Sequence, residues 1–108
     1  MPDPFKALAD PTRRALLLRV AEAPASVNEL ADNHSMSRPA VSRHLKVLEA
    51  AGLVGFDTGD ADGRQRICRA ELTALTEVED YLERVRTFWE NRLDRLGDYL
   101  EAQGENEE

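Results

Sequence analysis

Apolar residues in the first half of the chain recur every three or four positions, within short segments separated by proline, glycine or polar residues. This spacing is typical of amphipathic helices that bury one face. Three of the segments open with an Asp or Ser that can cap a helix, and two of these have a proline in the first turn. The pattern therefore predicts four helices, over about 4–8, 10–21, 26–33 and 37–51.

Beyond Gly52, which can end the fourth helix, the pattern changes to two short apolar runs. They cover about 54–57 and 65–69, and the residues between them include two glycines and two aspartates. Short runs bounded by turn-forming residues are typical of antiparallel strands. We expect a β-hairpin with a mobile tip at about 58–64.

The last third of the chain predicts one long helix, over about 71–103, because it contains no proline and its apolar residues keep a helical spacing. At ~1.5 Å per residue such a helix exceeds about 40 Å, which is longer than a domain of this size can cover. A second copy of the chain is expected to bury the stripe, since two-fold dimers are the commonest assemblies. The stripe consists of Leu75, Val78, Leu82, Val85, Trp89, Leu93, Leu96 and Leu100.

The predicted third and fourth helices are joined by about four residues, 33–36, and a hairpin follows them. This order of elements is that of a winged helix-turn-helix. At ~100° per residue, the fourth helix places Val41, Leu45 and Leu48 on one face. The opposite face offers small, hydroxyl and cationic side chains, which suit a helix that reads base edges and phosphates in DNA. These are Pro39, Ser42, Arg43 and Lys46, with Arg38 at the N-terminal end.

Charge at first argues against DNA as a partner. The 108 residues include 21 acidic and 14 basic side chains, a formal charge of −7, whereas DNA affinity depends on neutralising phosphates. The acidity is confined to the last third, however, because residues 70–108 hold twelve acidic and four basic side chains and residues 1–52 hold six and seven. The first half therefore stays compatible with DNA. Residues 104–108 are expected to form an acidic flexible tail.

Other candidate chemistry is sparse. The sequence has no glycine-rich phosphate loop and no nucleophile motif, so we expect no enzyme. Its single cysteine, Cys68, excludes an intrachain disulfide, but Arg66 and Arg69 nearby could favour a thiolate. A thiol redox sensor is therefore an alternative to a buried structural thiol. No apolar run reaches the ~20 residues of a membrane span, and we expect a cytoplasmic protein without a membrane partner.

Three stretches of the sequence resemble the ArsR/SmtB family of bacterial winged-helix transcriptional regulators. They are FKALADPTRR at 5–14, SRPAVSRHLKVL at 37–48 and AGLV at 51–54. The resemblance extends over about 5–100. It implies a dimeric repressor that pairs through its first and last helices and places the fourth helix of each protomer in adjacent major grooves of a pseudo-palindromic operator. An effector would loosen that binding.

The same resemblance implies two sets of site residues, one for DNA and one for the partner protomer. The DNA set comprises Ser37, Arg38, Pro39, Ser42, Arg43 and Lys46 in the fourth helix, with Arg64 and Arg66 in the wing. The dimer set comprises Phe5, Leu8, Leu82, Val85, Trp89, Leu93, Leu96 and Leu100.

The chain departs from the best-known members of that family, which sense metals through cysteines of the third helix or through Asp, His and Glu of the last one. Its predicted third helix has no cysteine and its last helix has no histidine, so we expect no metal sensing at those sites and no cofactor. The wing also departs, because Asp57, Asp60 and Asp62 make it acidic and weaken its expected contact with phosphates.

These observations predict a mainly α protein with a small β-hairpin. We expect a single winged helix-turn-helix domain over 1–103, with its recognition helix at about 37–51, its wing at about 54–69 and its dimerisation helix at about 71–103. The expected function is a homodimeric repressor that binds double-stranded operator DNA, and a small-molecule effector is left open. The alternatives are a winged helix that binds protein and a thiol-sensing repressor that uses Cys68.

Overall fold

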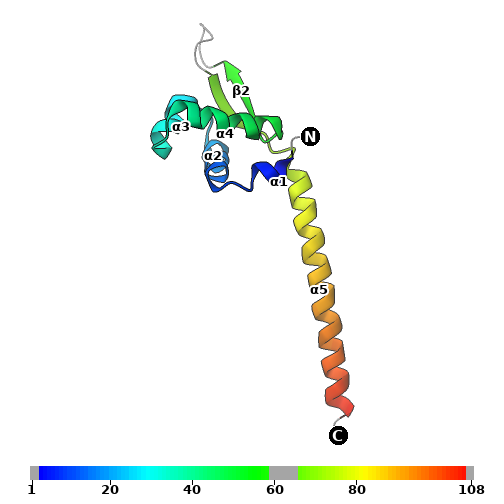
Figure 1. Ribbon diagram of the computed structural model, residues 1–108. Coiled ribbons are helices and arrows are strands. Elements are labelled where there is room, and N and C mark those ends of the chain that lie inside the picture. The colour runs from blue at the N-terminus through cyan, green and yellow to red at the C-terminus, as the bar shows by residue number, and fades with distance from the viewer. Residues whose placement is uncertain (1–2, 59–65, 107–108) are drawn as a thin grey trace. The chain divides into compact units, whose positions relative to one another are not determined.

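The computed structural model describes residues 3–58 and 66–106. Its contacts divide the chain into two units, Met1–Glu77 and Val78–Glu108, whereas the sequence predicts a single domain over 1–103. The predicted fold class is confirmed, because helices dominate and the strands form one small antiparallel sheet (Figure 1). The elements are α1 (Pro4–Ala7), α2 (Pro11–Glu22), β1 (Ala25–Ser26), α3 (Val27–His34), α4 (Arg38–Ala50), β2 (Val54–Thr58), β3 (Arg66–Ala70) and α5 (Leu75–Asn106).

Capping residues define the helix starts as the sequence predicts. The side chains of Asp10, Ser26 and Ser37 accept hydrogen bonds from backbone N–H groups two or three residues further on, at 2.7, 3.2 and 3.3 Å. Gly52 ends α4 with a φ of 78°, and its N–H donates to the carbonyl of Glu49 at 2.9 Å. Only glycine adopts this left-handed conformation without strain, so the stop that the sequence predicts at this position is confirmed.

The turn between α3 and α4 is tighter than the sequence predicts. α3 continues to His34, so the turn comprises 35–37 instead of 33–36. Ser35 adopts a left-handed φ of 53°, and the N–H of Met36 donates to the carbonyl of Ala31 at 3.0 Å. The left-handed residue reverses the chain abruptly, and this brings the start of α4 close to α3.

The sheet has three strands in the order β1-β3-β2, all antiparallel. The hairpin of β2 and β3 agrees with the prediction, but β1 is an additional strand that the sequence analysis misses. β1 has only two residues, Ala25 and Ser26, which pair with Cys68 and Ile67. A two-residue strand has no alternation to detect, so only the tertiary structure reveals it.

The core of the first unit lies between the helices and the sheet. It includes Val41, Leu45 and Leu48 of α4, which are fully buried as the angular pattern predicts. These side chains fix which face of α4 is turned outward. The other fully buried large side chains are Leu16, Val20, Leu30, Leu53 and Cys68.

α5 begins and ends later than the sequence predicts. The backbone N–H of Glu71 donates to the carbonyl of Leu53 at 2.8 Å, so this residue is tied to the first unit and the helix begins at Leu75. At the other end the helix continues through Asn106, into the predicted tail, because Gly104 costs a helix only about 1 kcal/mol. Residues 107–108 lie outside the described part of the chain. None of the described helices combines the length and apolarity needed to cross a membrane.

Candidate nucleic-acid interface

The outward face of α4 carries two exposed cations, Arg43 and Lys46. No hydrogen bond or ion pair joins either of them to another residue in 3–58 or 66–106. Pro39 is also exposed and Ser42 is half-buried, so small side chains flank the two cations. A surface of this kind can approach DNA closely and donate hydrogen bonds to bases and phosphates.

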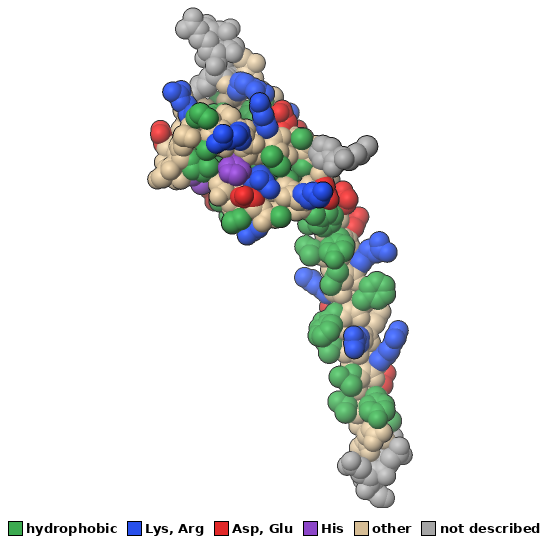
Figure 2. Space-filling view, in the orientation of Figure 1, with side chains coloured by type: hydrophobic (Ala, Val, Ile, Leu, Met, Phe, Trp, Pro, Cys, Tyr) green, Lys and Arg blue, Asp and Glu red, His purple; other side chains and the backbone are tan. Residues whose placement is uncertain are grey.

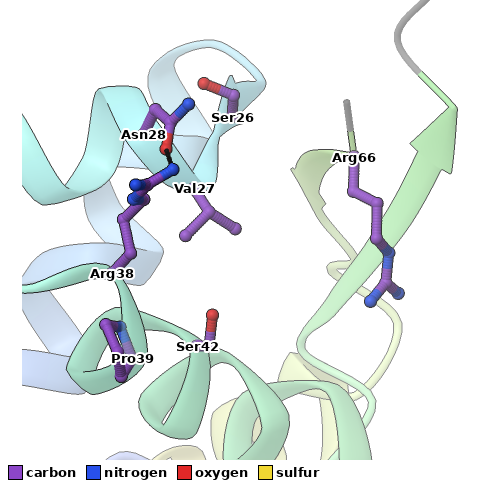
Figure 3. A pocket seen from close by; sticks show the side chains of 7 residues that line it. All are labelled: Ser26, Val27, Asn28, Arg38, Pro39, Ser42 and Arg66. Carbon is purple, nitrogen blue, oxygen red and sulfur yellow. Dashed lines mark hydrogen bonds between the residues drawn. The ribbon is translucent and has the colours of Figure 1, made fainter. Parts of the chain in front are cut away.

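The N-terminal end of α4 opens on a groove of about 570 Å³. Figure 3 shows Asn28 and Arg38 on one side of this groove and Arg66 on the other. A guanidinium nitrogen of Arg38, Nη1, donates to Oδ1 of Asn28 at 3.1 Å. Asn28 is not predicted from the sequence, because nothing in the local pattern of residues shows that α3 and α4 bring the two side chains together. The groove is lined by Ser26, Val27, Asn28, Arg38, Pro39, Ser42 and Arg66.

Arg66, a predicted DNA contact of the wing, makes two contacts within the protein. Its guanidinium lies 4.2 Å from the centre of the Phe56 ring, and its Nη2 lies 4.0 Å from Oε2 of Glu49. A cation held by an aromatic face and a carboxylate loses both contacts when it turns toward a phosphate. The other predicted wing contact, Arg64, lies outside the described residues, as do Asp60 and Asp62.

Asp57, one of the aspartates predicted to weaken the contact of the wing with phosphates, has a partner within the hairpin. Its Oδ2 accepts a hydrogen bond from Nε of Arg69 at 2.8 Å, and Arg69 also pairs with Glu71. Asp57 lies on β2 and Arg69 on β3, so the hairpin itself supplies a cation to this carboxylate. Because Asp57 and Glu71 share one arginine, the three groups keep one net negative charge, and the expected repulsion of DNA is reduced and not removed.

Two arginines of α2 hold the first helix in place. Arg13 donates through Nε to the carbonyl of Ala7 at 2.7 Å, and Nη1 of Arg14 donates to the carbonyl of Leu8 at 2.8 Å. These contacts satisfy carbonyls at the end of α1 that have no partner within the helix. Asp10, which caps α2, has its pKa lowered, mainly by the hydrogen bond that its carboxylate accepts from the backbone N–H of Arg13. This cluster stabilises the junction of α1 and α2.

Cys68 is fully buried on β3, the central strand of the sheet. Burial is the main cause that raises the pKa of its thiol to about 11, and the carboxylate of Glu49 adds to the effect. The two arginines that suggest a thiolate, Arg66 and Arg69, oppose this shift without reversing it. A protonated, inaccessible thiol is a poor nucleophile, so the structure argues against the redox alternative.

α5 exposes the apolar stripe that is predicted to bind a partner protomer, and Figure 2 shows apolar side chains along much of its length. The six predicted residues from Leu82 to Leu100 are 47–59% exposed. Phe88 and Tyr99 are also exposed, at 72% and 59%, and they widen the apolar surface beyond the prediction. Their separation of 11 residues is close to three helical turns, which is the signal that could have found them. The predicted α1 contacts differ, since Phe5 and Leu8 are half-buried and Leu8 packs against the core of the first unit.

These elements define a class of protein. Two helices meet at a tight turn, the second presents exposed cations, and an antiparallel hairpin follows it, which is the arrangement of a winged helix-turn-helix DNA-binding domain. Within the described residues, no group of three or more His, Cys, Asp or Glu side chains is placed to hold a metal ion.

Comparison with known proteins gives the family. Residues 10–55 match the family described as bacterial regulatory protein, arsR family. The chain is 38% identical over 102 residues to the HTH-type transcriptional regulator Rv2034 of Mycobacterium tuberculosis, covering 94% of this chain and 90% of that one. The chain therefore belongs to the ArsR family, and it is a DNA-binding transcriptional regulator and not an enzyme.

Two further relatives support this assignment. The chain is 44% identical over 65 residues to the HTH-type transcriptional repressor SmtB of Mycobacterium tuberculosis, over 60% of this chain and 46% of that one. The solved structure of an ArsR-like transcriptional regulator from Rhodococcus sp. RHA1 has a TM-score of 0.69 and 35% identity, covering 85% of this chain and 84% of the other.

Proposed function

We propose that this protein is a homodimeric repressor that inserts two copies of α4 into successive major grooves of a pseudo-palindromic operator. The observation that carries the proposal is the pair Arg43 and Lys46. Both are exposed on α4, and neither has a protein partner among the described residues. Unpaired cations on a helix whose other face is fully buried are expected to bind an external anion.

Each side chain of α4 has a distinct proposed role. Arg43 is proposed to read a guanine through two parallel hydrogen bonds, since its planar guanidinium matches the O6 and N7 acceptors. Lys46 is proposed to contact a phosphate as a compact point charge. Pro39 and Ser42 permit close approach. The Ser37 hydroxyl is used as the cap of α4, since it accepts the N–H of Ala40, and the positive end of the helix dipole is proposed to attract a phosphate to the start of the helix. Arg38 is proposed to reach DNA beside this helix end.

The proposed dimer follows from α5. Its exposed stripe is too extensive to remain in water in a stable protein, and a second α5 offers a matching surface. In such a dimer we propose that the two α4 helices lie about one helical turn of DNA apart, ~34 Å, the half-site spacing of helix-turn-helix dimers, and the two-fold symmetry predicts a pseudo-palindromic site. Repression is supported by the relative that is named a repressor, SmtB. A dimer that occupies two successive major grooves excludes other proteins from that DNA.

We also propose that metals do not control this regulator at the family's usual sites. α3 contains no cysteine and α5 contains no histidine, so those positions lack the soft and imidazole ligands that transition metals prefer. Adding zinc or arsenite is expected to leave operator affinity unchanged in a fluorescence anisotropy titration. A loss of affinity that depends on either agent, and is reversed by a chelator or a dithiol, would contradict this part of the proposal.

The operator can be recovered by sequencing genomic fragments that the purified protein retains. On a labelled duplex of that sequence, Arg43→Ala is expected to weaken binding about 30-fold or more, because the proposed dimer loses one bidentate base contact in each half-site. The matched control is Arg84→Ala, which removes the same charge from an exposed position on α5. Sedimentation should find both variants dimeric. Unchanged affinity of Arg43→Ala would refute the role of α4 and favour the alternative of a protein-binding winged helix.

A further inference from the structure

We infer that Asn28 of α3 is a positioning residue that aims Arg38 at the DNA. The inference rests on the proposed function, because it assigns a supporting group to one of the proposed DNA contacts. It begins with the hydrogen bond from Arg38 Nη1 to Asn28 Oδ1, 3.1 Å long (Figure 3). Asn28 is the second residue of α3 and Arg38 is the first of α4, so this bond joins the two helices of the helix-turn-helix.

The contact has no other evident structural purpose. The start of α3 is already capped by Ser26, whose hydroxyl accepts the N–H of Glu29 at 3.2 Å, so the side chain of Asn28 is not needed there. Asn28 and Arg38 are both exposed, and a hydrogen bond at the surface adds little to the free energy of unfolding. Its position at the edge of the groove beside α4 points instead to a role in binding.

The chemistry of the pair suits that role. A free arginine side chain samples many rotamers and loses this freedom when it binds a ligand. Asn28 restrains the Arg38 guanidinium before DNA binds. This contact uses one of the five N–H groups of the guanidinium and leaves the other four able to bind DNA. Because the amide oxygen is neutral, it orients Arg38 without cancelling its positive charge.

Arg66, across the groove, provides the contrast. Its guanidinium approaches the carboxylate of Glu49 and the ring of Phe56, so its charge is partly neutralised within the protein. Of the two arginines that line the groove, Arg38 therefore retains the stronger attraction for a phosphate or a base edge. The neutral partner at Asn28 accounts for this difference.

The test is a double-mutant cycle on the full-length protein with the recovered operator. Arg38→Ala is expected to weaken binding about tenfold and Asn28→Ala about threefold, because the second change removes only the preorganisation. The double variant should bind like Arg38→Ala alone, since Asn28 acts through Arg38. Asn28→Asp should weaken binding more than Asn28→Ala, because a carboxylate neutralises Arg38 and repels phosphates. The thermal midpoint of all four variants should equal that of the wild type.

Three outcomes would overturn the inference. The first is that Asn28→Ala leaves the affinity for the operator unchanged. The second is that Asn28→Ala weakens binding equally in the presence and absence of the Arg38 side chain, which would make Asn28 a direct DNA contact. Arg38→Ala can also leave the affinity unchanged, so that no contact exists for Asn28 to support. In that last case Arg43→Ala separates the two proposals: a large loss would preserve the role of α4, whereas no loss would refute the proposed function as well.

Discussion

α4 and α5 carry apolar residues at the same helical spacing, yet their surroundings are opposite. Leu45 and Leu48 of α4 are 1% and 0% exposed, whereas Leu93 and Leu96 of α5 are 47% and 51% exposed. The stripe of α4 is covered by its own unit, and the stripe of α5 beyond Val78 is not. Helical periodicity therefore shows that a face is built to be buried, but it does not show what buries it.

α4 and α5 also differ in the charge of their exposed residues. Arg43 and Lys46 of α4 are exposed cations without a partner in the described chain. α5 carries acidic residues between its apolar positions, and these account for most of the −7 charge of the protein. The overall charge of the protein therefore does not show that α4 is suited to bind DNA and that α5 is suited to bind a second protomer.

The strongest test of this comparison places a charge in the α5 stripe. Leu93→Glu should abolish the dimer, because an unpaired buried charge costs about 3–5 kcal/mol, and this corresponds to roughly 150- to 5,000-fold weaker association. Asn91→Glu on the opposite side of α5 is the matched control. Analytical ultracentrifugation should find the first variant monomeric or unfolded and the second dimeric. A dimeric Leu93→Glu protein would show that the stripe is buried by something else.

A change confined to the first unit should affect stability and spare the dimer. Asp10→Ala removes the cap of α2 and should lower the thermal midpoint by about 5 °C at neutral pH. The pKa of Asp10 is lowered in the folded protein, so its carboxylate stabilises the fold above the unfolded pKa of about 4. This stabilisation is lost as the pH falls through the lower folded value. Midpoints of the wild type and the variant should converge in acid, and a constant difference would contradict the assigned cause.

The smallest expected effect concerns the salt dependence of DNA binding. Each cation that neutralises a phosphate adds about 0.9 to the slope of log affinity against log salt concentration. Lys46→Ala should therefore reduce the slope by about two, because the dimer carries one Lys46 on each α4, whereas Arg84→Ala on α5 should leave it unchanged. The wild-type slope should be shallow for a repressor, because α4 carries few cations. A steep slope would mean that other parts of the protein contact phosphates.

Most of the fold and part of the candidate site are predictable from local sequence. Ser37 and Gly52 limit α4, and the angular positions of Arg43 and Lys46 already place them opposite the buried residues. Contacts between distant segments are not predictable in this way. Arg66 meets Phe56 through the pairing of β2 with β3, and it meets Glu49 because the hairpin lies beside α4. Asn28 meets Arg38 only across a turn tightened by Ser35.

The sequence by itself determined the starts of α2, α3 and α4, the end of α4, the hairpin and the outward face of α4, because capping, glycine stops and helical periodicity act over a few residues. The tertiary structure decided which polar groups already have a partner within the protein or are buried. It paired Asp57 with Arg69, enclosed Cys68 at the centre of the sheet and gave Arg38 a neutral partner. These outcomes depend on the packing of segments far apart in the chain, where burial and distance set the charge of each group.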